Sequence, residues 1–483
     1  MRVAIIGAGP RGLFAVERLW AHHRAGVLDV VLFDPREPGH GAAYDPGQPS
    51  CLRLNVTSAV VSAGWPGEDQ PPAFNEWRLD HGEVAPLDPF PPRARVGEYL
   101  RWFWAWLQDN APDGATVAHR QERVTTLQRE PRGWLVDGDR FDEVLLATGH
   151  ESNWPGALGG PGVVPALPVA AWADSVPAGG SVAVRGAALT FIDAALAMTE
   201  GRGGRFEGDW RTGLSYVASG SEPAVIWPTS RTGLLMDPKP QPGTPLAVPD
   251  EDTMVEGRRA VSRARSRVAA LRVVGDTASA LAGAVIETTP VQPATGAVEA
   301  MRERLEVMAG AREPGAAWAL GHAWRGLYDA LRARFEGIDG GFAPFAQTAV
   351  QLERVAFGPP PINAAKILAL LDAGIIDPSS LDGGPPREPD LVVDAVLAPP
   401  GVVPGSLLAE LVGRGVLWSP EGRRGVAVGP DASCVRPDGS SVTGLALIGR
   451  GTEDVVIGND TLNRSLHPAV DLWARRITAK EAP

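Results

Sequence analysis

The sequence predicts an α/β fold made of two strand–turn–helix units and an inserted helical region. The first unit opens the chain, where an apolar, β-branched run at residues 2–6 leads into a glycine-rich turn and an amphipathic segment. A second, less regular unit of the same kind lies at residues 181–200. Between residues 241 and 389, apolar side chains recur at helical spacing, which predicts a helical insertion.

The length of the chain predicts its number of structural units, and its net charge argues against some classes of partner. At about 150 residues per domain, 483 residues predict about three structural units. Lys and Arg total 45 against 57 Asp and Glu, and this acidic balance argues against a nucleic-acid or anionic-membrane partner. Two cysteines exclude a disulfide framework. Because neither a signal-peptide pattern nor a run of about 18 apolar residues is present, we expect a cytoplasmic protein.

The first unit carries the strongest motif. The predicted strand is followed by Gly7-Ala8-Gly9-Pro10-Arg11-Gly12, which has the form G-x-G-x-x-G, and then by a predicted helix over 13–20. A second buried strand at 28–33 ends on Asp34, 22 residues after the last glycine of the motif. This context is typical of a Rossmann-like dinucleotide site.

Each part of this motif has a physical role. Gly7 permits the tight turn, Gly9 lets the backbone approach a pyrophosphate, and Gly12 lets the helix pack close to the strand. The helix N-terminus presents unpaired N–H groups to the phosphates. Asp34 can accept hydrogen bonds from both ribose hydroxyls, which favours FAD or NAD over NADP. The alternative is a glycine turn without a nucleotide.

The second unit departs from the motif. A strand over 181–184 leads into Arg185-Gly186-Ala187-Ala188-Leu189-Thr190, which has Ala where a close pyrophosphate contact favours Gly. The next strand, at 225–227, is followed by Ser230 and Arg231, and a Ser-Arg pair can hold a 2′-phosphate. We therefore predict a nicotinamide cofactor, NADPH or NADH, held by Gly186, Thr190, Ser230 and Arg231. The alternative is a degenerate domain that keeps the fold without the ligand.

Three further strands fit a two-domain scheme. The strand at 141–149 ends in Ala147-Thr148-Gly149, and the run at 391–398 has a similar pattern. A buried strand at 444–450 ends in Gly449-Arg450. In flavoproteins with two dinucleotide domains, the first two are the points at which the chain crosses between the domains.

Together these features resemble flavin-dependent oxidoreductases in which an NAD(P)H domain interrupts an FAD domain. Within that class the chain resembles the amino-acid N-hydroxylating and other class B flavin monooxygenases, over most of 1–235 and 390–475. The segments that carry the resemblance are Gly7-Ala8-Gly9-Pro10-Arg11-Gly12, Gly39-His40-Gly41-Ala42-Ala43-Tyr44, Leu54-Asn55-Val56, Arg93-Ala94-Arg95-Val96-Gly97-Glu98-Tyr99-Leu100, Ala147-Thr148-Gly149, Ser230-Arg231-Thr232-Gly233 and Leu447-Ile448-Gly449-Arg450.

The resemblance implies a domain plan. Residues 1–160 and 390–483 would form the FAD domain, 161–240 the NAD(P)H domain, and 241–389 a helical cap that forms the substrate pocket or a homodimer surface. Within the cap, six arginines fall on one predicted helix between Arg258 and Arg272. We interpret them as a solvated face, or alternatively as a basic lip that attracts an acidic substrate or NADPH.

The resemblance also implies site residues. Asn55 would hydrogen-bond the reduced flavin or an oxygen adduct, although it could simply satisfy a turn. Asn459 or Asp460 would cap a helix aimed at the flavin ring, or a helix that only covers the sheet. Arg93 would bind the FAD phosphates or the substrate, or cap the Trp-rich helix that follows it. The remaining predicted FAD contacts are Thr148, Gly149, Gly449 and Arg450.

The implied activity is that of an FAD-dependent, NAD(P)H-using monooxygenase. Oxygen would pass from a flavin C4a-(hydro)peroxide to a small-molecule nucleophile, by amine or amino-acid N-hydroxylation or a related oxygenation. Metal and serine-nucleophile motifs are absent from the sequence. Two alternatives stay open: an FAD-dependent dehydrogenase or reductase without oxygen transfer, and a non-catalytic FAD-binding protein.

Overall fold

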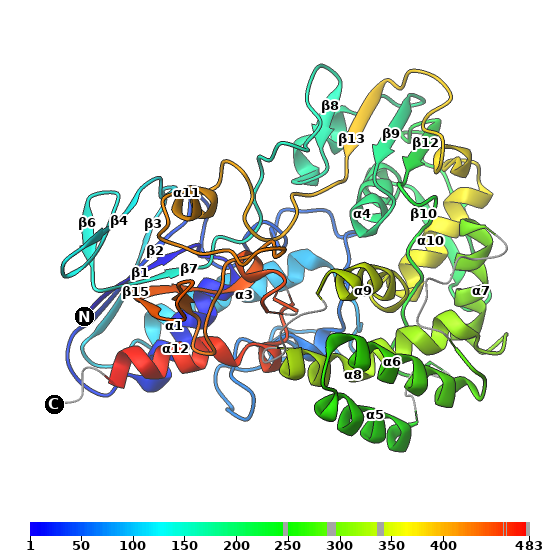
Figure 1. Ribbon diagram of the computed structural model, residues 1–483. Helices are drawn as coiled ribbons and strands as arrows, with labels where there is room; N and C mark the ends of the chain where they lie inside the picture. The colour runs from blue at the N-terminus through cyan, green and yellow to red at the C-terminus, as the bar shows by residue number, and fades with distance from the viewer. Residues whose placement is uncertain (245–249, 287–295, 336–341, 457, 460, 480–483) are drawn as a thin grey trace. The chain divides into compact units, whose positions relative to one another are not determined.

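A computed structural model describes residues 1–483 except 245–249, 287–295, 336–341, 457, 460 and 480–483. The chain forms two compact units (Figure 1). The first unit comprises Met1–Gln48, Ser58–Gly156 and Ala398–Pro483, and the second comprises Pro49–Thr57 and Ala157–Leu397. Each unit is described by itself below.

The first unit is built on a six-stranded sheet. In order across the sheet, its strands are β14 (Ser433–Val435), β15 (Ser441–Leu447), β7 (Glu143–Leu146), β1 (Arg2–Ile6), β2 (Leu28–Phe33) and β3 (Ala115–Arg120). All neighbours are parallel except β14 and β15. The central strands are apolar on both faces because both faces are covered, as is usual for parallel sheets. A small antiparallel sheet contains β4 (Leu127–Glu130), β5 (Gly133–Val136) and β6 (Asp139–Phe141).

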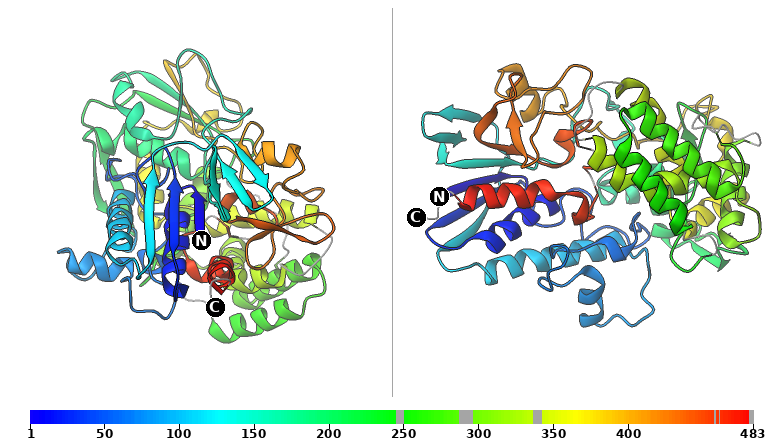
Figure 2. Two further views of the ribbon diagram at one scale, coloured as in Figure 1. Left: turned by 90° about the vertical axis from the view of Figure 1, so that its left-hand side faces the viewer. Right: turned by 60° about the horizontal axis from the view of Figure 1, so that its bottom comes forward.

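The described residues of the first unit form five α-helices. They are α1 (Pro10–His22), α2 (Phe74–Asp80), α3 (Arg93–Asp109), α11 (Leu407–Gly413) and α12 (Pro468–Thr478). Helix α1 packs against both α3 and α12, and Figure 2 shows α12, in red, running beside α1, in blue. Proline at the first position starts both α1 and α12, since its missing N–H is not needed there.

The second unit contains a four-stranded parallel sheet. Its strands, in order, are β12 (Val225–Thr229), β9 (Ser181–Arg185), β13 (Leu391–Asp394) and β8 (Val163–Pro165). Helix α4 (Leu189–Met198) follows β9, and β10 (Arg205–Asp209) and β11 (Gly213–Val217) form a hairpin. Strand β13, which we expected to begin the C-terminal part of the first domain, instead pairs with β8 and β9. The chain therefore leaves this unit only after Leu397.

The predicted helical insertion is present in the second unit. It contains α5 (Glu251–Arg263), α6 (Arg267–Ala282), α7 (Ala297–Ala309), α8 (Ala316–Phe335), α9 (Phe342–Ala356) and α10 (Pro361–Asp372). The prediction of one arginine-rich helix was wrong, because the first helix ends at Arg263 and a second begins at Arg267. There the Ser266 side chain accepts a hydrogen bond from the Ala269 amide and caps a new helix. Arg267 is buried rather than part of a solvated face.

The six-stranded and four-stranded sheets repeat one three-strand parallel arrangement, β7-β1-β2 in the first unit and β13-β9-β12 in the second. In each unit the glycine after the central strand donates its amide to the end of the neighbouring strand. The distances are 2.8 Å from Gly7 N to the Phe33 carbonyl and 2.9 Å from Gly186 N to the Thr229 carbonyl. This register aligns residues 2–7 with 181–186 and confirms two Rossmann-like domains in one chain.

None of the helices in the described part of the chain is long and apolar enough to cross a membrane.

Candidate functional site

The first glycine turn is shaped by contacts that only glycine permits. Gly7 has φ +110°, and a Cβ there would lie 2.1 Å from the Ala147 carbonyl oxygen. A Cβ on Gly12 would lie 2.2 Å from the Gly7 carbonyl oxygen. Gly9 is different, since its nearest neighbour would be 3.6 Å away. Packing among the described residues therefore does not require glycine at position 9, whereas the close approach of a phosphate would.

A cleft of about 580 Å³ opens at the carboxyl ends of β1 and β2. Asp34, Thr148 and Arg36 are among its lining residues, and its size is typical of a small-molecule site. One Asp34 oxygen accepts a 3.1 Å hydrogen bond from the Ala8 amide, and the other accepts a 2.9 Å bond from the Arg36 amide. The carboxylate is therefore held beside the glycine turn, where a ribose would need it.

The cleft contains charged residues that sequence reasoning missed. Glu151 lies in its wall, and burial raises the pKa of this carboxyl against the opposing effect of Arg123, which also lines the cleft. The sequence indicates these two residues only by their position, because Glu151 and Arg123 each follow a strand of the first domain. Glu151 comes two residues after the predicted Thr148-Gly149 pair. Gly149 has φ +70°, which lets the chain turn away at the end of β7.

The Arg11 side chain binds the C-terminal segment. Its guanidinium donates to the Asn459 carbonyl at 2.5 Å and to the Thr461 carbonyl at 2.9 Å. Gly449 has φ +77° and begins a 3₁₀ turn, and the Arg450 guanidinium donates to the Ala398 carbonyl at 3.1 Å. The Arg11 contacts join the start of α1 to the chain that follows β15.

The prediction that the last helix begins at Asn459 or Asp460 was wrong. Asp460 lies outside the described residues, and Asn459 sits in a turn. The helix begins at Pro468, because a 3₁₀ turn over Arg464–Leu466 intervenes. Asn463 caps that turn by accepting a 3.1 Å hydrogen bond from the Ser465 amide.

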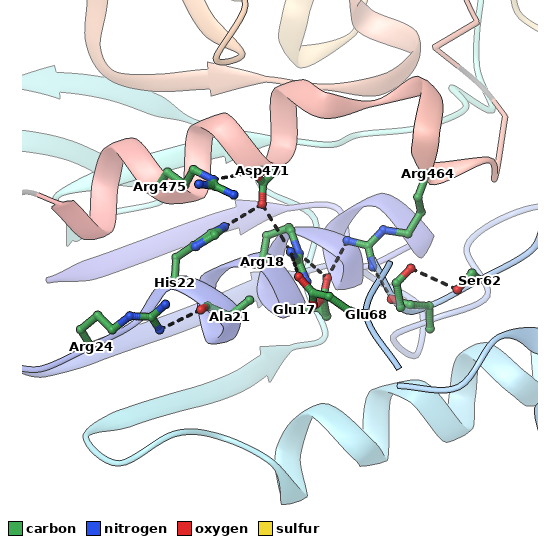
Figure 3. A network of polar contacts seen from close by, with 12 residues as sticks. Glu17, Arg18, Ala21, His22, Arg24, Ser62, Glu68, Arg464, Asp471 and Arg475 are labelled. Atoms are coloured by element: carbon green, nitrogen blue, oxygen red, sulfur yellow. Dashed lines mark hydrogen bonds and ion pairs between the residues drawn. The ribbon is translucent and has the colours of Figure 1, made fainter. Parts of the chain in front are cut away.

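A buried network of charges joins α1 to the C-terminal segment (Figure 3). Arg464 Nη2 lies 2.6 Å from Glu17 Oε2, and Arg18 contacts Glu17, Glu68 and Asp471. The Asp471 carboxylate also lies 2.6 Å from His22 Nε2. Burial favours a raised pKa for Asp471, but hydrogen bonds from His22 and Arg475 outweigh it and lower that pKa. The helix that presents the glycine turn is thereby held along one face.

The second glycine turn keeps the backbone path of the first. Gly186 has φ +109°, close to the value at Gly7, and Ala188 caps α4 with φ −98° and ψ −157°. That conformation is open to any residue. Thr190 lies in the first turn of α4, and Phe191 occupies the position of Gly12. The turn is therefore preserved, but it has gained two side chains.

Ser230 follows β12 as Asp34 follows β2. The Ser230 amide donates to the Leu381 carbonyl at 2.9 Å, and its hydroxyl lies 3.2 Å from the Thr232 hydroxyl. Arg231 is exposed, and it makes no hydrogen bond or ion pair with the residues that the structure describes. A hydroxyl in place of a carboxylate removes a negative charge that would repel a 2′-phosphate.

A bidentate ion pair at the second turn was not predicted. Arg185 Nε lies 2.7 Å from Asp394 Oδ1, and Arg185 Nη2 lies 2.8 Å from Asp394 Oδ2. The partners are separated by 209 residues in sequence, so the only local signal was an arginine next to the turn.

The two predicted catalytic residues among the described residues belong to different units. Arg93 is the first residue of α3 in the first unit. Asn55 belongs to the second unit, where its Nδ2 donates to the Phe357 carbonyl at 3.4 Å. The Asn55 Oδ1 atom is buried and has no hydrogen-bond partner in the described structure. A buried acceptor of this kind fits a ligand that brings an N–H group.

Among the described residues, no group of three His, Cys, Asp or Glu side chains is placed to hold a metal ion.

Comparisons with known proteins agree with this geometry. Residues 4–151 match the FAD-NAD(P)-binding family. The chain is 30% identical over 284 residues to an L-aspartate N-monooxygenase (nitrosuccinate-forming) of Streptomyces davaonensis, a match covering 48% of this chain and 43% of that protein. It is 33% identical over 266 residues to the nitrosuccinic acid synthase of Aspergillus oryzae, covering 48% and 40%. The chain thus matches less than half the length of these relatives.

Two solved structures share the fold along nearly the whole chain. The ornithine N-hydroxylase of Kutzneria sp. 744 has a TM-score of 0.53 at 14% identity, covering 99% of each chain. The cadaverine monooxygenase of Erwinia amylovora, solved with FAD, has a TM-score of 0.55 at 10% identity, covering 99% of this chain and 94% of that one. Residues 4–151 therefore match the FAD-NAD(P)-binding family, in a chain whose fold is similar to that of these two structures.

Proposed function

We propose that this protein is an FAD-dependent, NADPH-using monooxygenase that oxygenates the nitrogen of a small amine or amino acid. The observation that carries the proposal is the joining of an intact dinucleotide cleft to a second sheet of the same topology in one chain. The same fold is found in the ornithine and cadaverine enzymes. The reaction class comes from the relative at 30% identity, which is an L-aspartate N-monooxygenase.

The first unit has the groups that FAD requires. Gly9 and the N-terminus of α1 would face the pyrophosphate, Asp34 would accept hydrogen bonds from the ribose, and Thr148 would line the cleft. Gly449 and Arg450 would lie near the flavin in the domain made of residues 1–160 and the C-terminal segment. Bound there, FAD would supply the chemistry, by accepting a hydride from the nicotinamide and activating O2.

The second unit would bind the nicotinamide and orient the substrate. Ser230 and Arg231 would hold the 2′-phosphate of NADPH, beside the turn that contains Gly186 and Thr190. Asn55 would accept a hydrogen bond from the substrate amine or the flavin through its unpaired Oδ1. The helices of the insertion would enclose the substrate and exclude water.

A second candidate function is favoured by the altered second turn. Ala188 and Phe191 stand where the first turn has Gly9 and Gly12. A flavin dehydrogenase reduced directly by its substrate would not need a close dinucleotide contact there. This candidate predicts a protein that binds FAD and responds to substrate alone.

The test is an anaerobic titration of the purified, FAD-loaded protein with NADPH and then with NADH. The proposal expects the flavin absorbance to bleach with NADPH and to return on admission of air. A flavin that stays oxidised with both nucleotides, and also when candidate amines are present, would contradict it. Bleaching by substrate alone would favour the dehydrogenase. A protein that binds no FAD would exclude both functions.

A further inference from the structure

The Arg185–Asp394 pair occupies the place of an apolar pair in the first unit. In the register of β1 with β7, Ile6 lies opposite Leu146. In the register of β9 with β13, the equivalent positions are Arg185 and Asp394. The structure therefore replaces two buried aliphatic side chains with a guanidinium and a carboxylate at the same point of the repeat.

This position faces the dinucleotide cleft in the first unit. Ile6 lines the cleft together with Gly7 and Asp34. By the shared register, Arg185 lies at the carboxyl end of its strand, immediately before the second turn, with Ser230 at the end of the neighbouring strand. The Arg185 side chain is 29% exposed, whereas that of Asp394 is 5% exposed. The guanidinium is thus accessible at an edge where ligands of open α/β sheets bind.

The carboxylate is held rigidly. Besides the guanidinium, Asp394 accepts hydrogen bonds from the Leu158 amide at 2.8 Å and from the Val396 amide at 3.2 Å. A carboxylate held by several donors cannot swing away, so it determines the direction of the guanidinium.

We propose that Arg185 is a phosphate-binding residue of the second dinucleotide site and that Asp394 is its positioning residue. The inference rests on the proposed use of a nicotinamide dinucleotide by this unit. Ala188 brings a methyl group to the place where Gly9 leaves the backbone open, which weakens the backbone contact to a phosphate. A forked cation beside the turn compensates, because guanidinium groups bind phosphate oxygens in a bidentate manner.

A purely structural role would not require charge here. The first unit holds the same strands together with Ile6 and Leu146, and buried ion pairs are often no more stabilising than apolar residues of similar size. The first unit therefore suggests a double variant. Arg185→Ile combined with Asp394→Leu reproduces the Ile6–Leu146 pair of the first unit and leaves no unpaired buried charge.

The experiment uses the full, FAD-loaded protein. Dissociation constants for NADP+ and NAD+ are measured by calorimetry for the wild type, the double variant and Arg185→Lys, which keeps the charge but loses the fork. Arg211→Ile, which removes an arginine from the β10–β11 hairpin of the same unit, is the matched control. Thermal unfolding reports whether each variant is folded, and Arg185→Lys keeps the test open if the double variant does not fold.

The expected result is a loss of dinucleotide affinity of roughly 10- to 100-fold in the double variant, with a smaller loss in Arg185→Lys. Equal losses for both dinucleotides would assign the pyrophosphate, and a loss confined to NADP+ would assign the 2′-phosphate. Unchanged affinity in folded variants would overturn the inference while leaving the proposed function intact. A wild-type protein that binds neither dinucleotide would overturn both.

Discussion

Arg464 Nη2 lies 2.6 Å from Glu17 Oε2, although the two residues are 447 positions apart in the chain. Their side chains are 2% and 4% exposed, and the Arg464 guanidinium also covers the Phe14 ring. This contact ties the segment after β15 to the helix that presents the first glycine turn. The position of this helix therefore depends on residues from both ends of the sequence.

Replacing Arg464 should destabilise the first unit. Arg464→Met removes a buried positive charge beside Glu17, and breaking such a pair typically costs about 3–5 kcal/mol. Urea unfolding measures the loss. Arg475→Met is the control, because the Arg475 side chain is 62% exposed and its ion pair with Asp471 should contribute less than about 1 kcal/mol. Equal effects of the two substitutions would contradict the central role of Arg464.

The glycines of the first turn should separate stability from cofactor binding. Gly12→Ala places a methyl group against the Gly7 carbonyl and should cost roughly 1–3 kcal/mol of stability. Gly9→Ala meets no atom of the described residues closer than 3.6 Å, so its apoprotein should unfold like the wild type but bind FAD roughly tenfold or more weakly. Fluorescence titration with FAD checks this, and wild-type affinity in Gly9→Ala would refute it.

Ser230 should influence the choice between NADPH and NADH. Ser230→Asp introduces a carboxylate at the position that Asp34 occupies in the first unit. Repulsion between this carboxylate and the 2′-phosphate should weaken the binding of NADPH roughly tenfold or more and leave the binding of NADH unchanged. The measurement is the rate of flavin reduction against the concentration of each nucleotide. Thr232→Ala serves as the control, since it alters the same loop without adding charge. A parallel loss for both nucleotides would point to a disturbed loop instead.

Asn55 should matter for oxygen transfer more than for cofactor binding. Asn55→Leu removes the buried acceptor Oδ1, which has no partner in the described structure. Once a substrate is identified, product formed per NADPH oxidised should fall roughly tenfold, the net value of one hydrogen bond, with FAD affinity unchanged. Asn363→Leu is the control for general loss of packing, because Asn363 is a buried asparagine of the same unit whose Oδ1 likewise has no partner among the described residues. If both variants lose product equally, Asn55 has no special role.

Acid should destabilise the second unit through Glu222. Burial favours a raised pKa, but hydrogen bonds from the Tyr216 hydroxyl and the Ser219 amide lower the pKa of Glu222 to about 2 from its ordinary 4.5. Because the pKa is depressed in the folded state, the stabilisation is complete above about pH 4.5 and is lost as the pH falls toward 2. Urea midpoints between these pH values should fall in the wild type more steeply than in Glu222→Gln. The exposed Glu207→Gln should leave the slope unchanged.

Local patterns predicted much of this protein. The strand, turn and helix around Gly7, Gly9 and Gly12 follow from backbone sterics that depend on neighbouring residues, and the helices predicted between residues 241 and 389 are present. The second turn was also identified by its local sequence, including the substitution at Ala188. Such features are determined within a few residues, so periodicity and glycine placement suffice to identify them.

Tertiary structure decided the features that join distant segments. Only the folded chain shows Arg11 and Arg464 bound to partners hundreds of residues away, or Asp394 beside Arg185. In the folded chain the last helix begins at Pro468, because a capped 3₁₀ turn over Arg464–Leu466 precedes it. Charged side chains pair according to which strands and helices lie side by side. That information resides in the packing and is absent from any local stretch of sequence.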